Sequence, residues 1–500
     1  KGKEQKYGKA FMDSIDDGDI DDMHAYYNWY DYSLFRFFNG EFQDRFKMPD
    51  RPLISQEMST GYPNNETGHP THSYQIIHQN PESLVGYDCY DYADPACFLW
   101  AQSFITGELA EALRRSNDRA SGIMHFALLT WFRQVYDADR IEPWPTYYAL
   151  ARALQPVLVS AELWGRHQYA GEKLATRVCV VNDLEEGRAL RPTLLRWELR
   201  DERGRVLDHG DRMLDSVPHY GRLWIDPEIT IPESLPEEKV KARLYLKLTE
   251  DGIPVSANEY ELLLTTRDWA KGNKTGDGKQ RLAILKGEGA DKTAATLTSL
   301  GIEYARYASV TQMLAANPTV AIISDTHVLN DYDAKALRKY EENGGRILFL
   351  NSNEAAKAVF PGHILSWEVP TEGDITFMER NDSRVFDGIE PLELRYFNNN
   401  RREIPTACNT TMQVNRSEAL TELAGQIKIH AYIDGGGSKA RLDRINSLRG
   451  FTVVGINEGK GSAIVSTMAT QKADTDPVAA RLLRNMVETL VSGAPFTPSI

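Results

Sequence analysis

The N-terminal third of the chain combines short apolar runs with stretches of helical periodicity. Residues 51–55 (RPLIS) and 121–129 (SGIMHFALL) are apolar without clean alternation, which is typical of buried parallel strands. Between them, residues 94–118 carry apolar side chains at helical spacing. A further helix is expected over 146–160, with a stop near Pro156. This order of strand, helix, strand and helix predicts α/β structure.

The pattern changes twice further along the chain. From about 157 to 268, short alternating runs are separated by turn signals, which is typical of a β-sandwich. Hairpin turns are predicted at 201–204 (DERG) and 250–252 (EDG). Beyond the polar stretch 271–280, apolar strands alternate with helices as in βαβ units. This last region is therefore predicted to be a doubly wound α/β unit.

These changes of pattern predict a multidomain chain. A length of 500 residues is more than one hydrophobic core usually serves, which favours about three domains. We expect an α/β unit over 1–156, a β-sandwich over 157–270, a linker over 271–280 and a second α/β unit over 281–500.

Composition narrows the class of partner. The formal net charge of -14 repels phosphate backbones and anionic lipids, so we expect neither a nucleic acid nor a membrane as partner. No stretch reaches the length of apolar sequence that a membrane span needs. The four cysteines have no CxxC spacing, and the loop with His69 and His72 lacks the spacing of a zinc-binding helix. We therefore expect no metal and no cofactor.

One carboxylate stands where a parallel barrel would hold a catalytic group. Glu57 lies just past the end of the apolar strand 51–55, and strand ends in a (β/α)₈ barrel point side chains into the active-site cleft. Taken alone, the same pattern also fits a surface glutamate in a loop. Upstream, residues 23–32 (MHAYYNWYDY) concentrate five aromatic residues and one histidine.

Taken in order, these segments resemble glycoside hydrolase family 2. In its β-glucuronidase-like members the sixth barrel strand ends in Asn-x-Tyr-Tyr-x-Trp-Tyr, and the seventh ends in the nucleophilic glutamate. Residues 24–30 (HAYYNWY) and 52–57 (PLISQE) are similar to these two motifs. Residues 121–132 look like the eighth strand, and residues 141–160 look like the closing helix that leads into an immunoglobulin-like sandwich. The resemblance covers residues 20 to about 268.

The resemblance implies a retaining exo-β-glycosidase that removes terminal neutral sugars from an oligosaccharide. Glu57 would form the glycosyl-enzyme and Tyr26 would orient it, while His24 and Trp29 would contact the sugar. The family takes its acid/base from an Asn-Glu pair after the fourth strand, and no such segment precedes Asp13. We therefore expect this chain to be the C-terminal part of a barrel enzyme, with the acid/base in an N-terminal remainder of the same polypeptide.

Two departures from the family pattern bear on the sugar. His24 stands where the family has Asn, and residues 141–147 (IEPWPTY) lack the Asn and Lys that bind a uronate in β-glucuronidases. A β-galactosidase-like activity is therefore favoured. A β-mannosidase, a β-glucuronidase, and a non-catalytic carbohydrate-binding or assembly relative stay open.

Further sugar contacts are expected from the loops after the two strands. Asn64, Asn65 and His69 are candidates for binding hydroxyl groups, and the alternative is a rigid loop folded by its proline and glycine residues. Trp131 can stack on a sugar or pack in the core. Successive strand residues point to opposite sides, so we expect His125 to face the sugar and the next residue, a phenylalanine, to pack on the outer helices.

The last α/β unit resembles the flavodoxin-like, amidotransferase-like domains attached to some galactosidases. Its strand ends show no Gly-x-Cys-x-Gly elbow, and Cys408 has no convincing histidine partner, so the unit is expected to be catalytically inert. It would contact neighbouring domains or subunits, which leaves a homo-oligomer open. By function alone, the resemblance implies a bacterial periplasmic or extracellular protein that degrades polysaccharide.

Overall fold

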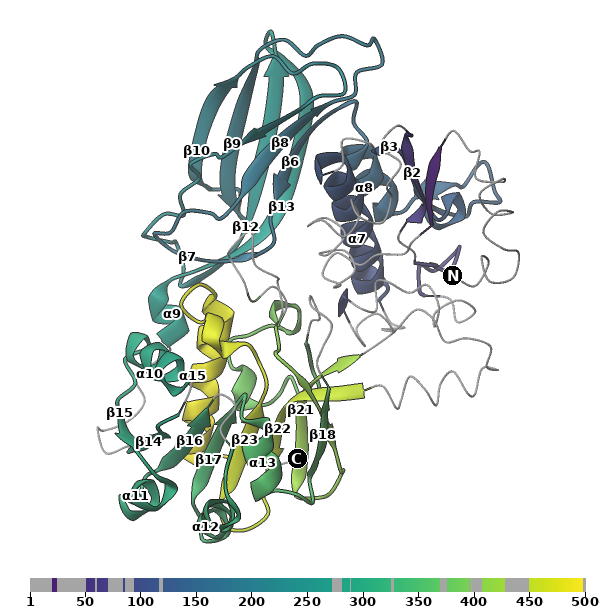
Figure 1. Ribbon diagram of the computed structural model, residues 1–500. Coiled ribbons are helices and arrows are strands. Elements are labelled where there is room, and N and C mark those ends of the chain that lie inside the picture. The colour runs from purple at the N-terminus through teal and green to yellow at the C-terminus, as the bar shows by residue number, and fades with distance from the viewer. Residues whose placement is uncertain are drawn as a thin grey trace, which may run out of the picture.

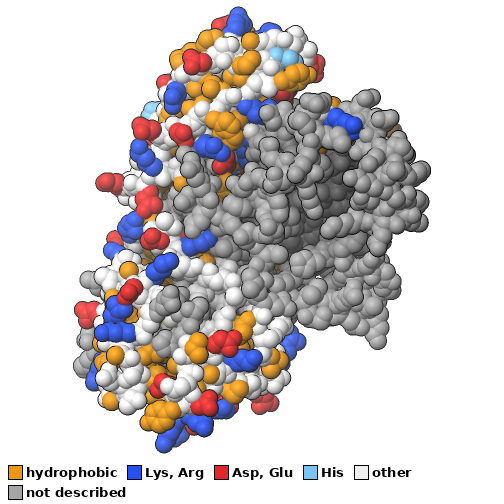
Figure 2. All heavy atoms as spheres, in the orientation of Figure 1, with side chains coloured by type: hydrophobic (Ala, Val, Ile, Leu, Met, Phe, Trp, Pro, Cys, Tyr) orange, Lys and Arg blue, Asp and Glu red, His pale blue; other side chains and the backbone are white. Residues whose placement is uncertain are grey.

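The structure is a computed structural model in which the protein is a multidomain α/β chain (Figure 1). No helix among the described residues is long and apolar enough to cross a membrane. On the face shown in Figure 2, acidic and basic side chains are interspersed over the described surface. The described residues are 20–24, 51–58, 61–70, 84–85, 94–116, 120–271, 281–287, 289–324, 328–368, 376–394, 397, 407–427 and 449–497.

The N-terminal unit has a small parallel sheet in the order β1-β2-β3, formed by β1 (Asp21–His24), β2 (Leu53–Met58) and β3 (Ala120–His125). The long helix α7 (Ala96–Ser116) packs with α8 (Pro145–Ala153) (Figure 1). Their apolar faces and the start of β2 share one core cluster. The chain between β3 and α8 forms a 3₁₀ turn, η3 (Leu128–Thr130), and a two-stranded ribbon of β4 (Phe132–Arg133) and β5 (Glu142–Pro143).

Three predicted boundaries differ from the structure. The strand expected over 51–55 extends to Met58, because its pairing continues to Gln56 with β1 and to Met58 with β3. The strand expected over 121–129 ends at His125, and the chain turns into η3 at Leu128. The helix expected over 146–160 ends at Ala153, and the following apolar residues form β6 (Val157–Glu162) instead. Every residue of β6 is buried, and a short run of that kind cannot be told from a helix by its periodicity.

The central unit is built from two sheets. A five-stranded sheet has the order β10-β9-β12-β13-β7, and a three-stranded sheet has the order β11-β8-β6. Their facing side chains form one apolar cluster, and burial alternates along β12 as expected for a strand with one face in the core. The other strands are β7 (His167–Tyr169), β8 (Arg177–Asn182), β9 (Thr193–Asp201), β10 (Val206–Leu214), β11 (Arg222–Ile225), β12 (Lys239–Glu250) and β13 (Ile253–Thr265).

Both predicted hairpin turns are confirmed. The turn between β9 and β10 contains Gly204 at φ 77°, and β12 joins β13 through Asp251 at φ 49° and Gly252 at φ 80°. Two successive positive φ angles suit the right-handed twist of the flanking strands, and glycine adopts them without the strain of a side chain.

The C-terminal unit follows the short helix α9 (Arg267–Lys271) and has a mixed sheet in the order β15-β14-β16-β17-β23-β22-β20-β18. Its first five strands in that order are parallel, and the later ones are antiparallel. The parallel strands are β14 (Leu282–Leu285), β15 (Tyr304–Tyr307), β16 (Val320–Ser324), β17 (Arg346–Leu350) and β23 (Ser462–Ser466). The others are β18 (Ile364–Glu368), β19 (Phe377–Met378), β20 (Thr411–Val414), β21 (Leu420–Ile427) and β22 (Arg449–Ile456), with β19 pairing β21 beside β22.

Helices cover both faces of this sheet, as the alternation of strands and helices predicted. Alternate residues of each parallel strand belong to different core clusters, one on each face. The helices are α10 (Ala290–Ser299), α11 (Val310–Ala315), α12 (Asp331–Glu342), α13 (Asn353–Val359) and α15 (Pro477–Ser492) (Figure 1). One of the two clusters includes side chains of α15 together with Tyr169 and Trp269, so it continues into the central unit.

Candidate functional site

The strand ends of the N-terminal unit define the candidate site. In the parallel register, His24 of β1 lies opposite Gln56 of β2, and Met58 of β2 lies opposite His125 of β3. The backbone of Glu57 therefore lies between these two pairs, at the carboxyl edge of the sheet. Carboxyl ends of parallel strands meet at one edge, where the following loops converge.

Two loops meet above this edge and are tied to each other. The amide of Gln134 donates to the carbonyl of Asn65 at 2.8 Å, and the amide of Val135 donates to the Asn65 side-chain oxygen at 2.8 Å. The Arg133 guanidinium donates to the carbonyl of Glu66 at 2.9 Å. These contacts fix the loop after β2 against the segment after β3, although the two lie about 70 residues apart in sequence.

Gly68 lets the first loop approach the second closely. It has φ 80°, and a Cβ atom at this position would lie 3.1 Å from both the Trp144 ring and Leu99. A side chain at this position would be strained in its backbone and crowded by two neighbours. The glycine therefore allows the loop after β2 to pack directly on Trp144 and α7.

His125 and Trp131 form a buried pair. The indole N–H of Trp131 donates to Nδ1 of His125 at 2.6 Å, and burial lowers the pKa of His125 to about 3. The ring is therefore neutral near neutral pH. Because the indole can only donate, Nδ1 accepts and the proton of the imidazole is on Nε2. Among the residues that the structure describes, buried Nε2 has no hydrogen-bond partner.

The other predicted contacts fall into three groups. The Asn64 side chain accepts from the amides of Glu66 and Thr67 at 2.9 and 3.1 Å, so it folds its own loop. Asn65 joins the two loops as described above, and His69 is half buried in the same loop. Tyr26 and Trp29 lie outside the described residues, and only the backbone is described for His24 and Glu57. Their roles stay predictions.

The aromatic residue next to His125 packs differently from its expected position against the outer helices. The ring of Phe126 meets Tyr62 edge to face, with 6.0 Å between the ring centroids. Tyr62 belongs to the loop after β2, so Phe126 contributes to the junction of the two loops. β3 ends at His125, so Phe126 lies just beyond the strand and the alternation expected for this pair does not apply to it.

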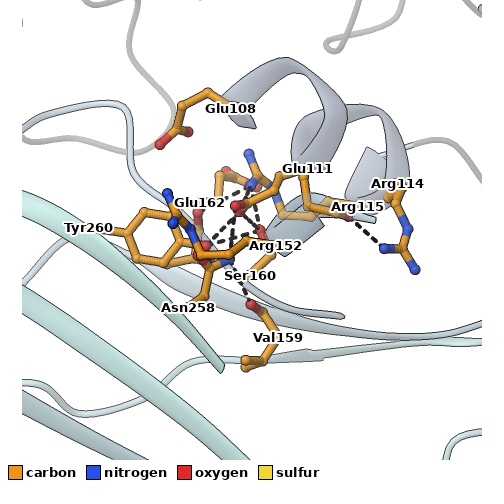
Figure 3. A network of polar contacts seen from close by, with 12 residues as sticks. Glu108, Glu111, Arg114, Arg115, Arg152, Val159, Ser160, Glu162, Asn258 and Tyr260 are labelled. Atoms are coloured by element: carbon orange, nitrogen blue, oxygen red, sulfur yellow. Dashed lines mark hydrogen bonds and ion pairs between the residues drawn. The ribbon is translucent and has the colours of Figure 1, made fainter. Parts of the chain in front are cut away.

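A buried polar network that sequence reasoning missed joins α7 to the central unit (Figure 3). The Glu111 carboxylate accepts from Ser160 at 2.5 Å, from the Tyr260 hydroxyl at 2.6 Å and from Asn258 at 2.8 Å. Arg115 lies 3.5 Å from the same carboxylate and donates to Ser160 at 2.7 Å. Each of these groups is buried and has a partner, as buried polar groups require.

A second ion pair extends this interface. Arg166 donates to Glu108 at 2.6 Å, with both side chains buried. Burial raises the pKa of the Glu108 carboxyl, and the positive charge of Arg166 opposes that shift. Glu108 and Glu111 are three positions apart on α7, so they lie on one helical face. That spacing was readable in the sequence, but nothing in it showed that this face is buried.

A cavity of about 680 Å³ lies next to this interface, where all three units meet. Trp100 and Phe104 of α7 line it as a stacked pair with ring centroids 5.2 Å apart. Lys241 and Glu390, which also line it, pair with each other at 2.8 Å. Part of the charge in the cavity wall is therefore neutralised within the protein.

Comparison with known proteins shows distant structural similarity only. No family model matches the chain, and no curated protein matches it. A β-D-mannosidase from Dictyoglomus thermophilum is 16% identical over 48% of this chain and 30% of its own, with a TM-score of 0.31. An exo-chitosanase from Amycolatopsis orientalis is 19% identical over 34% of this chain and 20% of its own, with a TM-score of 0.24.

A different similarity involves a protein outside the glycosidases. A putative ThuA-like protein from Bacteroides uniformis is 12% identical over 45% of this chain and 98% of its own length, with a TM-score of 0.31. The chain thus spans between a fifth and a third of the two glycosidases and nearly all of the ThuA-like protein. At these identities the similarity concerns the fold alone.

Proposed function

We propose that the chain is the C-terminal part of a retaining exo-β-glycosidase that acts on terminal neutral sugars, with β-galactosidase-like activity favoured. In this proposal residues 1–156 belong to a (β/α)₈ barrel, residues 157–270 form an immunoglobulin-like sandwich and residues 281–500 form a flavodoxin-like domain. The order β15-β14-β16-β17-β23 supports the last assignment, because the second strand lies outside the first in flavodoxin-like sheets.

One observation carries the catalytic proposal. The parallel order β1-β2-β3 brings the carboxyl end of β2, with Glu57 one residue before its last, beside the end of β3 at His125. Catalytic residues of barrel enzymes come from the ends of several strands at this face. A carboxylate from one strand and a neutral N–H donor from the next suit a nucleophile and a hydroxyl contact.

The proposed reaction has two steps. The Glu57 carboxylate attacks the anomeric carbon and forms an ester, while the glycosidic oxygen leaves with a proton from an acid elsewhere in the polypeptide. In the second step the residue that served as the acid takes a proton from water. That water hydrolyses the ester and restores the Glu57 carboxylate. The Nε2 proton of His125 would hold one sugar hydroxyl during both steps.

The test is Glu57→Gln in the complete polypeptide. The amide keeps the shape of the side chain but cannot form the ester, so the rate on nitrophenyl glycosides is expected to fall below about a few per cent of wild type. The exposed Glu185→Gln serves as control. A 2-deoxy-2-fluoro glycoside should label the wild-type peptide that contains Glu57. Retained turnover, or labelling elsewhere, would remove Glu57 from this role, and a complete lack of activity in wild type would favour a carbohydrate-binding relative.

A further inference from the structure

An unbroken series of aromatic rings leads from the candidate site to the surface of the N-terminal unit. The ring of Trp131 lies 6.0 Å from His125 and 6.5 Å from Phe132. Phe132 lies 5.3 Å from Tyr147, and Tyr147 lies 5.5 Å from Tyr148, centroid to centroid. We call the four rings from Trp131 to Tyr148 the aromatic stripe.

Exposure to solvent increases along the aromatic stripe. His125, next to its inner end, is buried. Trp131 and Phe132 are half buried, and Tyr148 at the outer end is 53% exposed. Large contiguous aromatic surface on a folded protein marks an interaction site more often than isolated exposed residues do. Since the inner end is the His125 and Trp131 pair, the stripe is continuous with the candidate sugar site.

The stripe is held in place by backbone contacts. Phe132 pairs with Pro143 in the β4 and β5 ribbon, and the amide of Trp144 donates to the carbonyl of Trp131 at 2.7 Å. Tyr147 lies in the first turn of α8, which begins at Pro145. The rings therefore do not depend on a mobile loop, and little conformational entropy is lost when they bind a ligand.

A charged pair lies on the other face of the ribbon from Phe132. In the register of the ribbon, Arg133 follows Phe132 and is paired with Glu142, with their charged atoms 3.5 Å apart. Both side chains are more than 40% exposed. The stripe itself offers exposed ring faces, and these match the apolar C–H face of a sugar.

We propose that the aromatic stripe binds the sugar units on the leaving-group side of the scissile bond, so that the substrate is an oligosaccharide or polysaccharide longer than a disaccharide. This inference rests on the proposed function, because it takes the terminal sugar to occupy the site at His125. A protein partner is the competing occupant, but the continuity of the rings with the candidate site favours a glycan.

The test compares Tyr148→Ala with Tyr220→Ala in the complete polypeptide. Tyr220 is 70% exposed on the central unit, beside His219, and is a matched control. For Tyr148→Ala, KM on β-linked galacto- or manno-oligosaccharides is expected to rise about fivefold or more, while kcat/KM on nitrophenyl monosaccharides stays unchanged. Tyr220→Ala should change neither value.

A second experiment, which measures binding without turnover, tests this proposal separately from the assignment of the nucleophile. In a Glu57→Gln background, calorimetry with the same oligosaccharides should show affinity that increases with chain length and that Tyr148→Ala weakens about fivefold or more. If Glu57→Gln stays active and hydrolyses the oligosaccharide, the assignment of the nucleophile fails, and the KM comparison of Tyr148→Ala with Tyr220→Ala tests the stripe by itself. Equal binding by Tyr148→Ala and Tyr220→Ala, or a change of oligomeric state without a change in glycan binding, would overturn it.

Discussion

The two junctions of the central unit differ in the share of polar contacts at their centre. The junction with α7 is a buried network of carboxylates, guanidinium groups and hydroxyls around Glu111. The junction with the C-terminal unit is mainly an apolar core that includes Tyr169 and Trp269 together with side chains of α15, with one buried polar pair, His167 and Asp476, at its edge. A buried charged network allows only one relative position of its two sides, because each donor and acceptor needs its partner. An apolar core is stabilised in proportion to the area it buries, and this contribution depends little on the orientation of the side chains.

Among the changes proposed here, removal of the Glu111 carboxylate should lower the free energy of unfolding most. Glu111→Ala removes the carboxylate nearest to buried Arg115 and takes an acceptor from three donors, so we expect a loss of about 3–5 kcal/mol in the free energy of unfolding. Urea unfolding measures it. Glu228→Ala is the control, because Glu228 also pairs with a cation, Lys173, but is 83% exposed, so its removal should change the stability far less than Glu111→Ala does. Similar losses for both variants would refute the contrast.

Acidification should destabilise the protein through His125 of the candidate site. Burial holds the pKa of His125 at about 3, below the value of 6.5 of an unfolded histidine. Between about pH 3 and pH 6.5 the unfolded state binds more protons at this histidine than the folded state does. The stabilisation that depends on neutral His125 is therefore fully present above about pH 6.5. Below that value, the free energy of unfolding falls by about 1.4 kcal/mol for each pH unit. His125→Gln should reduce this slope below pH 6. An unchanged slope would show that His125 is not the responsible group.

Removal of one hydroxyl from the apolar junction should have the smallest effect. The Tyr169 hydroxyl donates to the carbonyl of Ala473 at 2.8 Å, and its ring is part of the shared core. Tyr169→Phe keeps the ring, so we expect a loss of only about 1 kcal/mol by urea unfolding. A loss as large as that of Glu111→Ala would mean that polar contacts dominate this junction as well.

The sequence predicted features that depend on local chemistry. The turn at 250–252 follows from an Asp-Gly pair that tolerates positive φ, and the alternating pattern of β12 follows from one buried face. The end of the helix over 146–160 was wrong, because a short buried strand and a helix share the same apolar run. Local signals therefore give the type of most elements but not every boundary.

The strands that carry the candidate site could be predicted from the sequence, but the contacts between its loops could not. The strand that carries Glu57 and the neighbouring strand that ends at His125 were readable from their apolar runs. The contacts of Asn65 with residues 134 and 135 were not, because they join loops that are distant in sequence. Glu111 was also missed, since helical spacing shows which charges share a face but not which face is buried.

The apolar core shared by Trp269 and α15 also limits which gene fusions can produce a folded chain of this kind. Any recombination event that exchanged the C-terminal unit would have to preserve both sides of this core together, because either side alone would expose apolar surface to water. The junction at α7 poses a different condition. There the exposed faces would be charged and readily hydrated, but a new partner would have to supply a matching set of donors and acceptors around Glu111.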